Sequence, residues 1–178
     1  MSPTHQTNPD LYRVFSLGLA TNVISQNEVV AWADGVILME ESPDGFVVEL
    51  SLVGSRDKNA VITLLNGIIG PEMSPISGRV VLGLIYRRFV DGKLSLKIAV
   101  SAIDRLSWTA GLSEEEQRFM LPLDDGYALA TSGTFGTVKA IETQTMRFLE
   151  VYKDFRLDNM QEWQAIDASI ADKIKQLK

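Results

Sequence analysis

The chain has 178 residues, no cysteine and a formal net charge of −6 at pH 7. The lack of cysteine excludes disulfides, thiolate nucleophiles and zinc–thiolate sites. The acidic balance disfavours nucleic-acid binding, because phosphate contacts need clustered Lys and Arg. No stretch approaches the roughly 20 apolar residues that span a bilayer, and the start lacks a signal-peptide pattern. We therefore expect a cytoplasmic protein with no nucleic-acid partner, no membrane association and no cofactor.

Residues 1–9 are polar, include two prolines and show no periodicity, which predicts a disordered tail. The only histidine, His5, lies in this tail. The side chain most often used as a general base near neutral pH is therefore expected to be inert. Residues 10–178, close to the common size of one domain, are expected to form a single helical domain. Its first helix should begin near Pro9 or Asp10 and end by Asn22 or Ser25.

The strongest helix-start signal is the pair Ser25 and Glu28. It forms a capping box, in which the side chain of each residue accepts a hydrogen bond from the backbone amide of the other. Apolar residues then follow at helical spacing as far as Met39. Pro43 should stop this helix, because the residue before a proline is pushed away from the helical conformation.

The next segment, residues 43–52, is ambiguous between helix and strand. Its apolar residues recur at helical spacing, so we expect a short helix with Ser42 as its N-cap. Its β-branched residues also suit a strand over residues 46–53. A further helix, capped by Ser55, should follow and end at Gly70, because its aliphatic stripe stops there.

The rest of the chain predicts five more helices. They are expected at Pro75–Val90, Ser95–Ala110, Glu114–Leu121, Phe135–Phe155 and Asn159–Leu177. Ser113 and Glu116 form a second capping box at the start of the third. Apolar residues occupy every second position of residues 93–100, which also suits a strand. Pro122 should either break the third of these helices or kink a continuation of it.

These patterns together predict an all-α fold, a single-domain irregular bundle or array of about eight helices. The alternative is an α+β fold with a small sheet. The last expected helix carries a narrow apolar seam, which would either dock on the bundle or join two copies into a homodimer. The seam consists of Trp163, Ile166, Ile170, Ile174 and Leu177.

Few residues carry a chemical motif, and no catalytic, cofactor-binding or metal-binding residue is predicted. Ser55 and Lys58 match the S-x-x-K spacing of a lysine-activated serine, but the companion motifs of that chemistry are absent. The feature that packing does not explain is a group of carboxylates near residue 40, where a helix would end on charges that its dipole disfavours. This group is the candidate interaction surface, and it consists of Asp34, Glu40, Glu41 and Asp44.

One part of the chain resembles short bacterial all-helical proteins that have no assigned function. The resemblance rests on the pattern E-V-x-x-W-A-D-x-x-I, followed by the Pro-led segment 43–52 and the aliphatic helix 61–69. The matching residues are Glu28, Val29, Trp32, Ala33, Asp34 and Ile37. The resemblance implies an all-helical bacterial protein and brings no activity, cofactor or site with it.

Three functions are compatible with these observations. The first is a non-catalytic cytoplasmic protein-binding module, of the accessory or toxin-immunity type. It is favoured by the acidic charge and by the missing catalytic residue types. The second is a small enzyme or ligand sensor that uses carboxylates in a helical pocket. The third is a structural homodimer built on the last helix.

Overall fold

The computed structural model of the protein describes residues 9–177, which contain nine α-helices and no strand. The predicted all-α fold is confirmed. The chain divides into two compact units, one ending at Glu72 and the other beginning at Met73. The expectation of a single domain stays a prediction. The predicted tail lies outside the described residues except for Pro9, which is the first residue of α1.

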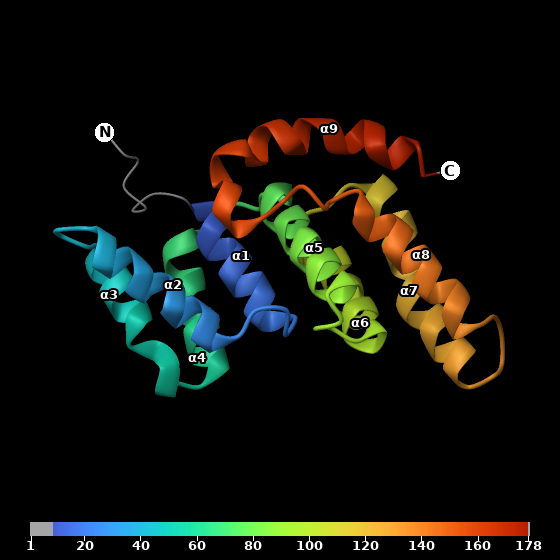
Figure 1. Cartoon of the computed structure of the whole chain (residues 1–178), viewed down its shortest axis with the longest axis horizontal. Helices are drawn as coiled ribbons and strands as arrows, with labels where there is room; N and C mark the ends of the chain where they lie inside the picture. The colour runs from blue at the N-terminus through green and yellow to red at the C-terminus, as the bar shows by residue number, and fades with distance from the viewer. Residues whose placement is uncertain (1–8, 178) are drawn as a thin grey trace. The chain divides into compact units, whose positions relative to one another are not determined.

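The first unit contains four α-helices and a short 3₁₀ turn (Figure 1). They are α1 (Pro9–Ala20), α2 (Gln26–Met39), α3 (Gly45–Ser51), the turn Val53–Ser55 and α4 (Lys58–Ile69). Helices α1 and α4 run antiparallel. The Ser16 hydroxyl donates to Asn66 at 2.6 Å, and Lys58 at the start of α4 donates to Asn22 after the end of α1 at 2.7 Å.

An aromatic cluster holds α1, α2 and α3 together. The Tyr12 ring meets Phe46 edge-on at a centroid distance of 5.2 Å and Trp32 at 6.0 Å. Trp32 also packs against Phe15 at 5.2 Å. Such pairs add roughly 0.5–1.5 kcal/mol beyond the apolar area that they bury. Trp32 therefore belongs to the packing of this unit, although its side chain is only half-buried.

The helix starts of this unit confirm one predicted cap and correct two. The Ser25 capping box is present. The cap of α3 is Asp44 instead of Ser42, and the cap of α4 is Asp57 instead of Ser55. Each aspartate accepts the amide hydrogen two residues further on, at 2.7 Å. A charged acceptor at this position also interacts favourably with the helix dipole, which a serine hydroxyl does not do.

The second unit contains five α-helices, with α5 at its centre. They are α5 (Pro75–Val90), α6 (Leu96–Thr109), α7 (Glu114–Thr131), α8 (Val138–Glu150) and α9 (Trp163–Lys175). Helix α5 packs against α6, α8 and α9. Figure 1 shows α9 running across one end of α5, α7 and α8. Within the described residues, no helix combines the length and the apolar character needed to cross a membrane.

The backbone of α5 approaches the segment after α8 very closely at Gly83. A Cβ atom at this position would lie 2.6 Å from the carbonyl oxygen of Tyr152 and 2.8 Å from that of Phe155. Real Cβ atoms do not come so close to a carbonyl oxygen, so the contact requires glycine. It allows α5 to sit in the middle of the unit.

The turns that follow α1 and α5 have the same geometry. Asn22 and Gly92 both adopt the left-handed conformation, with φ of 61° and 68°. After each, the next two amides donate to one carbonyl near the end of the helix, that of Gly18 in the first turn and that of Arg88 in the second. A serine N-cap then opens the next helix. The left-handed residue and the paired amides recur after α7, where Gly133 precedes two amides that donate to the carbonyl of Leu129. Residues 9–177 therefore use this turn between helices three times.

Two helices of the second unit differ from their predicted extents. Helix α7 continues through Pro122 to Thr131, so the proline does not break it. Helix α8 begins at Val138 instead of residue 135, because Gly133 and Gly136 hold positive φ values of 73° and 72° that no helix contains.

The last predicted helix is divided in two. Residues 157–162 form a 3₁₀ turn in which Asn159 leaves the helical conformation. Helix α9 starts only at Trp163, whose indole donates to the carbonyl of Arg156 at 2.8 Å.

The apolar seam of α9 is already covered by its own unit. Trp163, Ile170 and Ile174 are at most 3% exposed, and α9 packs against α5 and α7. Ile166 and Leu177 are half-buried. The seam therefore docks on the bundle, which was the first of its two predicted roles. A homodimer built on these residues would first have to uncover them.

Candidate functional site

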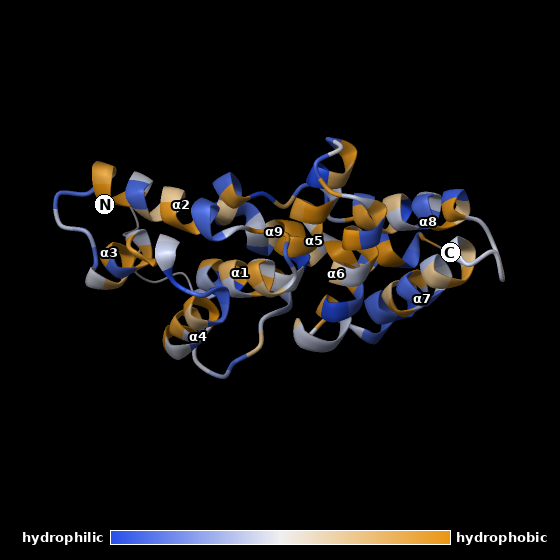
Figure 2. Cartoon of the chain, turned by 90° about the horizontal axis from the view of Figure 1, so that it is seen from below, coloured by the Kyte–Doolittle hydropathy of each residue, from blue (hydrophilic) through white to orange (hydrophobic). Residues whose placement is uncertain are grey.

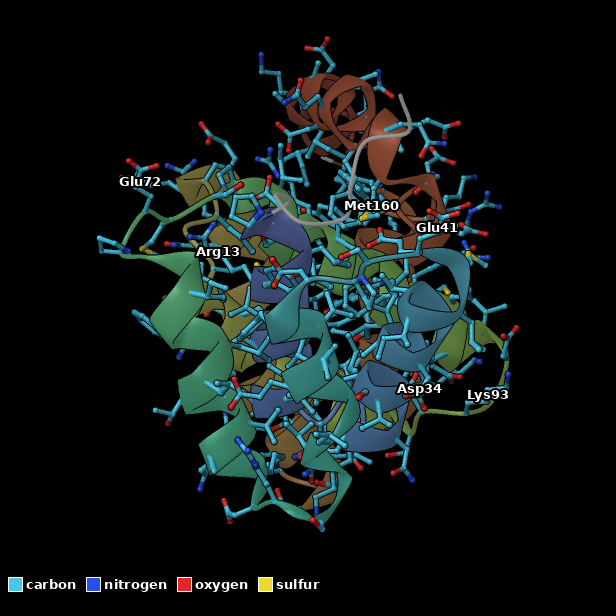
Figure 3. The ribbon with its side chains drawn as sticks, turned by 90° about the vertical axis from the view of Figure 1, so that its left-hand side faces the viewer. Arg13, Asp34, Glu41, Glu72, Lys93 and Met160 are labelled. Carbon is cyan, nitrogen blue, oxygen red and sulfur yellow. The ribbon has the colours of Figure 1, made fainter. Side chains whose placement is uncertain are left out.

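The structure separates the four carboxylates of the predicted interaction surface. Asp34 lies partway along α2 and is exposed, while Glu41 follows the end of that helix and is also exposed (Figure 3). At 1.5 Å per residue, Asp34 and Glu40 lie about 9 Å apart along the helix axis. The four residues therefore do not form a compact carboxylate pocket of the kind that acid–base chemistry needs.

Glu40 and Asp44 have local structural roles and share one buried neighbour. The backbone amide of Glu40 donates the last helical hydrogen bond of α2, to the carbonyl of Val36 at 3.0 Å, and the extended conformation of Glu40 ends the helix. Asp44 caps α3. Both carboxylates act on Tyr12. Burial raises the pKa of the Tyr12 phenol, and the negative charges of Asp44 and Glu40 raise that pKa further. The pair thus helps to keep a buried phenol protonated.

Two apolar side chains lie directly beside these acids. Leu38 is 87% exposed and Met39 is 85% exposed. The helical spacing of Met39 predicts a place on the apolar stripe of α2, and this prediction is wrong. Figure 2 shows the hydrophobic colour at the end of α2 and the hydrophilic loop that follows it. The end of α2 therefore presents an apolar pair next to a run of acidic residues.

The acids around this apolar pair have no charge partner within the described part of the chain. Asp34, Glu40 and Glu41 form no ion pair with any residue in the described range 9–177. The last turn of α2 contains no basic residue either. A negative field therefore surrounds Leu38 and Met39, and the helix dipole at this C-terminal end adds to it.

A second group of charged side chains, which the sequence analysis did not find, is buried in the other unit. The Arg79 guanidinium on α5 donates two hydrogen bonds to the Glu116 carboxylate on α7, both at 2.8 Å. A third guanidinium bond reaches Asp167 on α9 at 2.6 Å. The Tyr152 hydroxyl donates to Glu116 at 2.9 Å. We call these four residues the Arg79 network.

The electrostatics of the Arg79 network favour the charged pair. Burial alone would raise the pKa of Glu116, but the hydrogen bonds and charge of Arg79 outweigh it and lower that pKa. Burial would likewise lower the pKa of Arg79, and the bonds to Glu116 and Asp167 outweigh it and raise that pKa. Burial and the charge of Glu116 hold the pKa of Tyr152 well above its usual value.

The Arg79 network connects three helices instead of offering a reactive group. The Glu116 carboxylate accepts bonds from Arg79, from Tyr152 and from the amide of Ser113 at 2.8 Å. A carboxylate with this many donors is a poor base. The Ser113–Glu116 capping box was predicted from the sequence and is present. Nothing in that pattern indicates that Glu116 is also completely buried against an arginine of another helix.

The remaining chemical motif does not form a site. Lys58 directs its amine to the side-chain oxygen of Asn22 at 2.7 Å, and Ser55 is exposed in the 3₁₀ turn before α4. The S-x-x-K spacing therefore reflects neighbouring helix-end residues. Within residues 9–177, no three His, Asp or Glu side chains gather in a way that could hold a metal ion.

Comparisons of the chain with protein families, with curated proteins and with solved structures find no match.

Proposed function

We propose that the protein is a non-catalytic cytoplasmic protein-binding module that docks a basic segment of its partner on the end of α2. The docking surface, called the α2-end surface below, consists of Asp34, Leu38, Met39, Glu40 and Glu41. The observation that carries the proposal is the exposure of Leu38 and Met39 beside carboxylates that have no charge partner. Of the three functions expected from the sequence, protein binding is the one that this surface supports best.

The apolar pair would supply most of the binding energy. Single exposed apolar residues are common and need no explanation. Two large neighbours that are both almost fully exposed offer a partner an anchor of the kind found at the centre of protein interfaces. Covering a Leu or Met side chain completely is worth about 1.5–3 kcal/mol.

The carboxylates would select the partner by charge. Three acids without a charge partner, in a chain of net charge −6, attract a segment that carries Lys or Arg and repel acidic ones. Rim charges of this kind mainly raise the association rate and make it sensitive to salt, because exposed charges are screened beyond about 8–10 Å at physiological ionic strength. The expected partner segment therefore combines basic side chains with at least one large apolar side chain.

A peptide selection tests both parts of this proposal. A random peptide library displayed on phage is panned against the full chain, and a retained peptide is then synthesised and titrated by fluorescence anisotropy. Retained peptides should be enriched in Lys, Arg and large apolar residues. The double variant Leu38→Ser/Met39→Ser should lose at least about tenfold in affinity, since two anchors of about 1 kcal/mol or more are removed. Glu41→Gln should weaken binding less and should reduce its salt dependence.

Two matched variants make the test specific. Leu52→Ser and Ile68→Ser remove exposed apolar side chains from the same unit, where they are 69% and 49% exposed. Both should bind the selected peptide as tightly as the wild type. Retention of predominantly acidic peptides, or equal affinity for Leu38→Ser/Met39→Ser and the wild type, would show that this surface is not the docking site.

A further inference from the structure

A second surface, in the other unit, has the features of a small-molecule site. A cavity of about 250 Å³ lies between α7 and α8, next to the C-terminal end of α9. Its apolar wall is built from Phe119, Pro122 and Leu123 of α7, Phe148 of α8 and Leu177 after α9. None of these residues belongs to the α2-end surface, so the two sites are independent.

Stacked rings form one side of this cavity. Phe119 and Phe148 lie nearly parallel, with an interplanar angle of 21° and ring centroids 6.3 Å apart. Phe148 is buried and Phe119 is half-buried. Leu123 lies one helical turn after Phe119, so both side chains occupy the same face of α7. The wall of the cavity is therefore apolar and is held by packed residues of two helices.

Two arginines stand among the polar groups of the cavity. Arg118 of α7 and Arg147 of α8 line it together with Gln144. Arg118 forms no ion pair or hydrogen bond with any residue in the range 9–177. Arg147 lies in the last turn of α8, where the helix dipole stabilises a positive charge. Guanidinium groups at an apolar cavity match a ligand that carries a carboxylate.

The size of the cavity restricts the ligand to a small molecule. Sites for drug-sized ligands measure about 300–1,000 Å³, so this cavity suits a smaller compound. We propose that it binds a small organic carboxylate with an apolar body, in the manner of a medium-chain fatty acid. The apolar chain lies against Phe119, Phe148 and Leu177, and the carboxylate is held by Arg118 and Arg147.

A titration with two matched probes tests this site on the full chain. Sodium octanoate and 1-octanol have the same apolar chain and differ in charge, and each is titrated into isotopically labelled protein by NMR. Octanoate should give saturable shifts of the amides of Phe119, Phe148 and Leu177. It should bind at least about tenfold more tightly than octanol, because only the carboxylate can accept charge-assisted hydrogen bonds from the two guanidinium groups.

Variants separate the role of the arginines from a loss of structure. In Arg118→Gln/Arg147→Gln, octanoate affinity should fall at least about tenfold, to the level of octanol, while octanol affinity stays unchanged. The same substitution in the other unit, Arg56→Gln, should leave octanoate binding as it is. Three outcomes would overturn the proposal: no saturable shift at these amides, equal affinities of octanoate and octanol for the wild type, or undiminished octanoate binding by the double variant.

The outcome of this titration is independent of the α2-end surface. Leu38→Ser/Met39→Ser should bind octanoate like the wild type, because neither residue lines the cavity. Failure of the peptide selection and failure of the octanoate titration can therefore be told apart.

Discussion

The Arg79 network yields the sharpest prediction about stability. Replacing Arg79 by methionine keeps most of the side-chain length and removes the charge, so Glu116 stays completely buried without its counterion. Breaking a buried ion pair in this way typically costs about 3–5 kcal/mol. The Arg79 side chain is 12% exposed and Asp167 is 23% exposed, so water screens part of the network. We therefore expect the lower end of that range, a loss of about 3 kcal/mol at pH 7.

The same variant should respond to pH in a defined direction. In the wild type the pKa of Glu116 is lowered on folding. Its stabilising contribution is therefore complete above the unfolded value of about 4.3 and is lost as pH falls through the folded pKa. In Arg79→Met, burial without the arginine raises the pKa of Glu116. As pH falls, Glu116 is therefore protonated in the variant before it is protonated in the wild type, and protonation removes the cost of the buried charge. The difference in unfolding free energy between the two proteins should therefore begin to shrink as pH falls through the raised pKa of the variant, above about 4.3. It should shrink further as pH falls through the lowered pKa of the wild type.

Urea unfolding at pH 7 and at pH 3 measures both effects. The reporter is the fluorescence of Trp163, in a background in which the other two tryptophans are replaced, Trp32→Phe and Trp108→Phe. Trp163 is buried in the same unit as the network. The matched control is Arg56→Met, because the pair Arg56–Glu49 is 45% and 43% exposed and is expected to contribute only about 0–1 kcal/mol. If Arg79→Met were no less stable than this control, or if its deficit were the same at both pH values, the network would not be a buried, charge-dependent connection between helices.

Two further stability predictions follow from packing. The hydroxyl of Thr145 is buried without a hydrogen-bond partner among the described residues, so Thr145→Val, which keeps the shape, should stabilise the protein by about 1 kcal/mol and raise the urea midpoint. Gly83→Ala should destabilise by at least about 1–3 kcal/mol, because its Cβ would clash with the carbonyl oxygens of Tyr152 and Phe155. Its control is Gly67→Ala, also inside a helix but with open space around it, which should stabilise by about 1 kcal/mol in the same measurement. A stabilised Gly83→Ala would mean that the backbones are not in close contact.

Local chemistry made most of the helices predictable from the sequence. The predicted Pro75–Val90 helix is observed with both ends in place, since a proline starts it and a left-handed glycine follows it. The Ser25 and Ser113 capping boxes are likewise complete within a few residues of sequence. These features depend on backbone groups within one turn, so neighbouring residue types determine them.

The errors arise where a local pattern has competing solutions or depends on distant residues. Both Ser55 and Asp57 can cap a helix, and the charged side chain does so in the structure. Asn22 and Gly92 form the same left-handed turn with different residue types. A search of the sequence for identical residues therefore does not detect that the turn is repeated. The exposure of Met39 depends on which elements cover the end of α2, and helical spacing carries no information about that.

Glu116 and Glu41 illustrate why the candidate site could be predicted only in part. Both are glutamates near a helix end, and each lies in a short run of glutamates. Glu116 lies in the first turn of α7, where the dipole favours it, and it is buried against Arg79. Glu41 follows the last turn of α2, where the dipole disfavours it, and it has no ion-pair partner in the range 9–177. Glu116 stabilises the folded state, and this role is enough to explain its presence. Glu41 costs a few tenths of a kcal/mol and lies next to exposed apolar side chains, and the proposed docking of a basic partner segment would explain its presence.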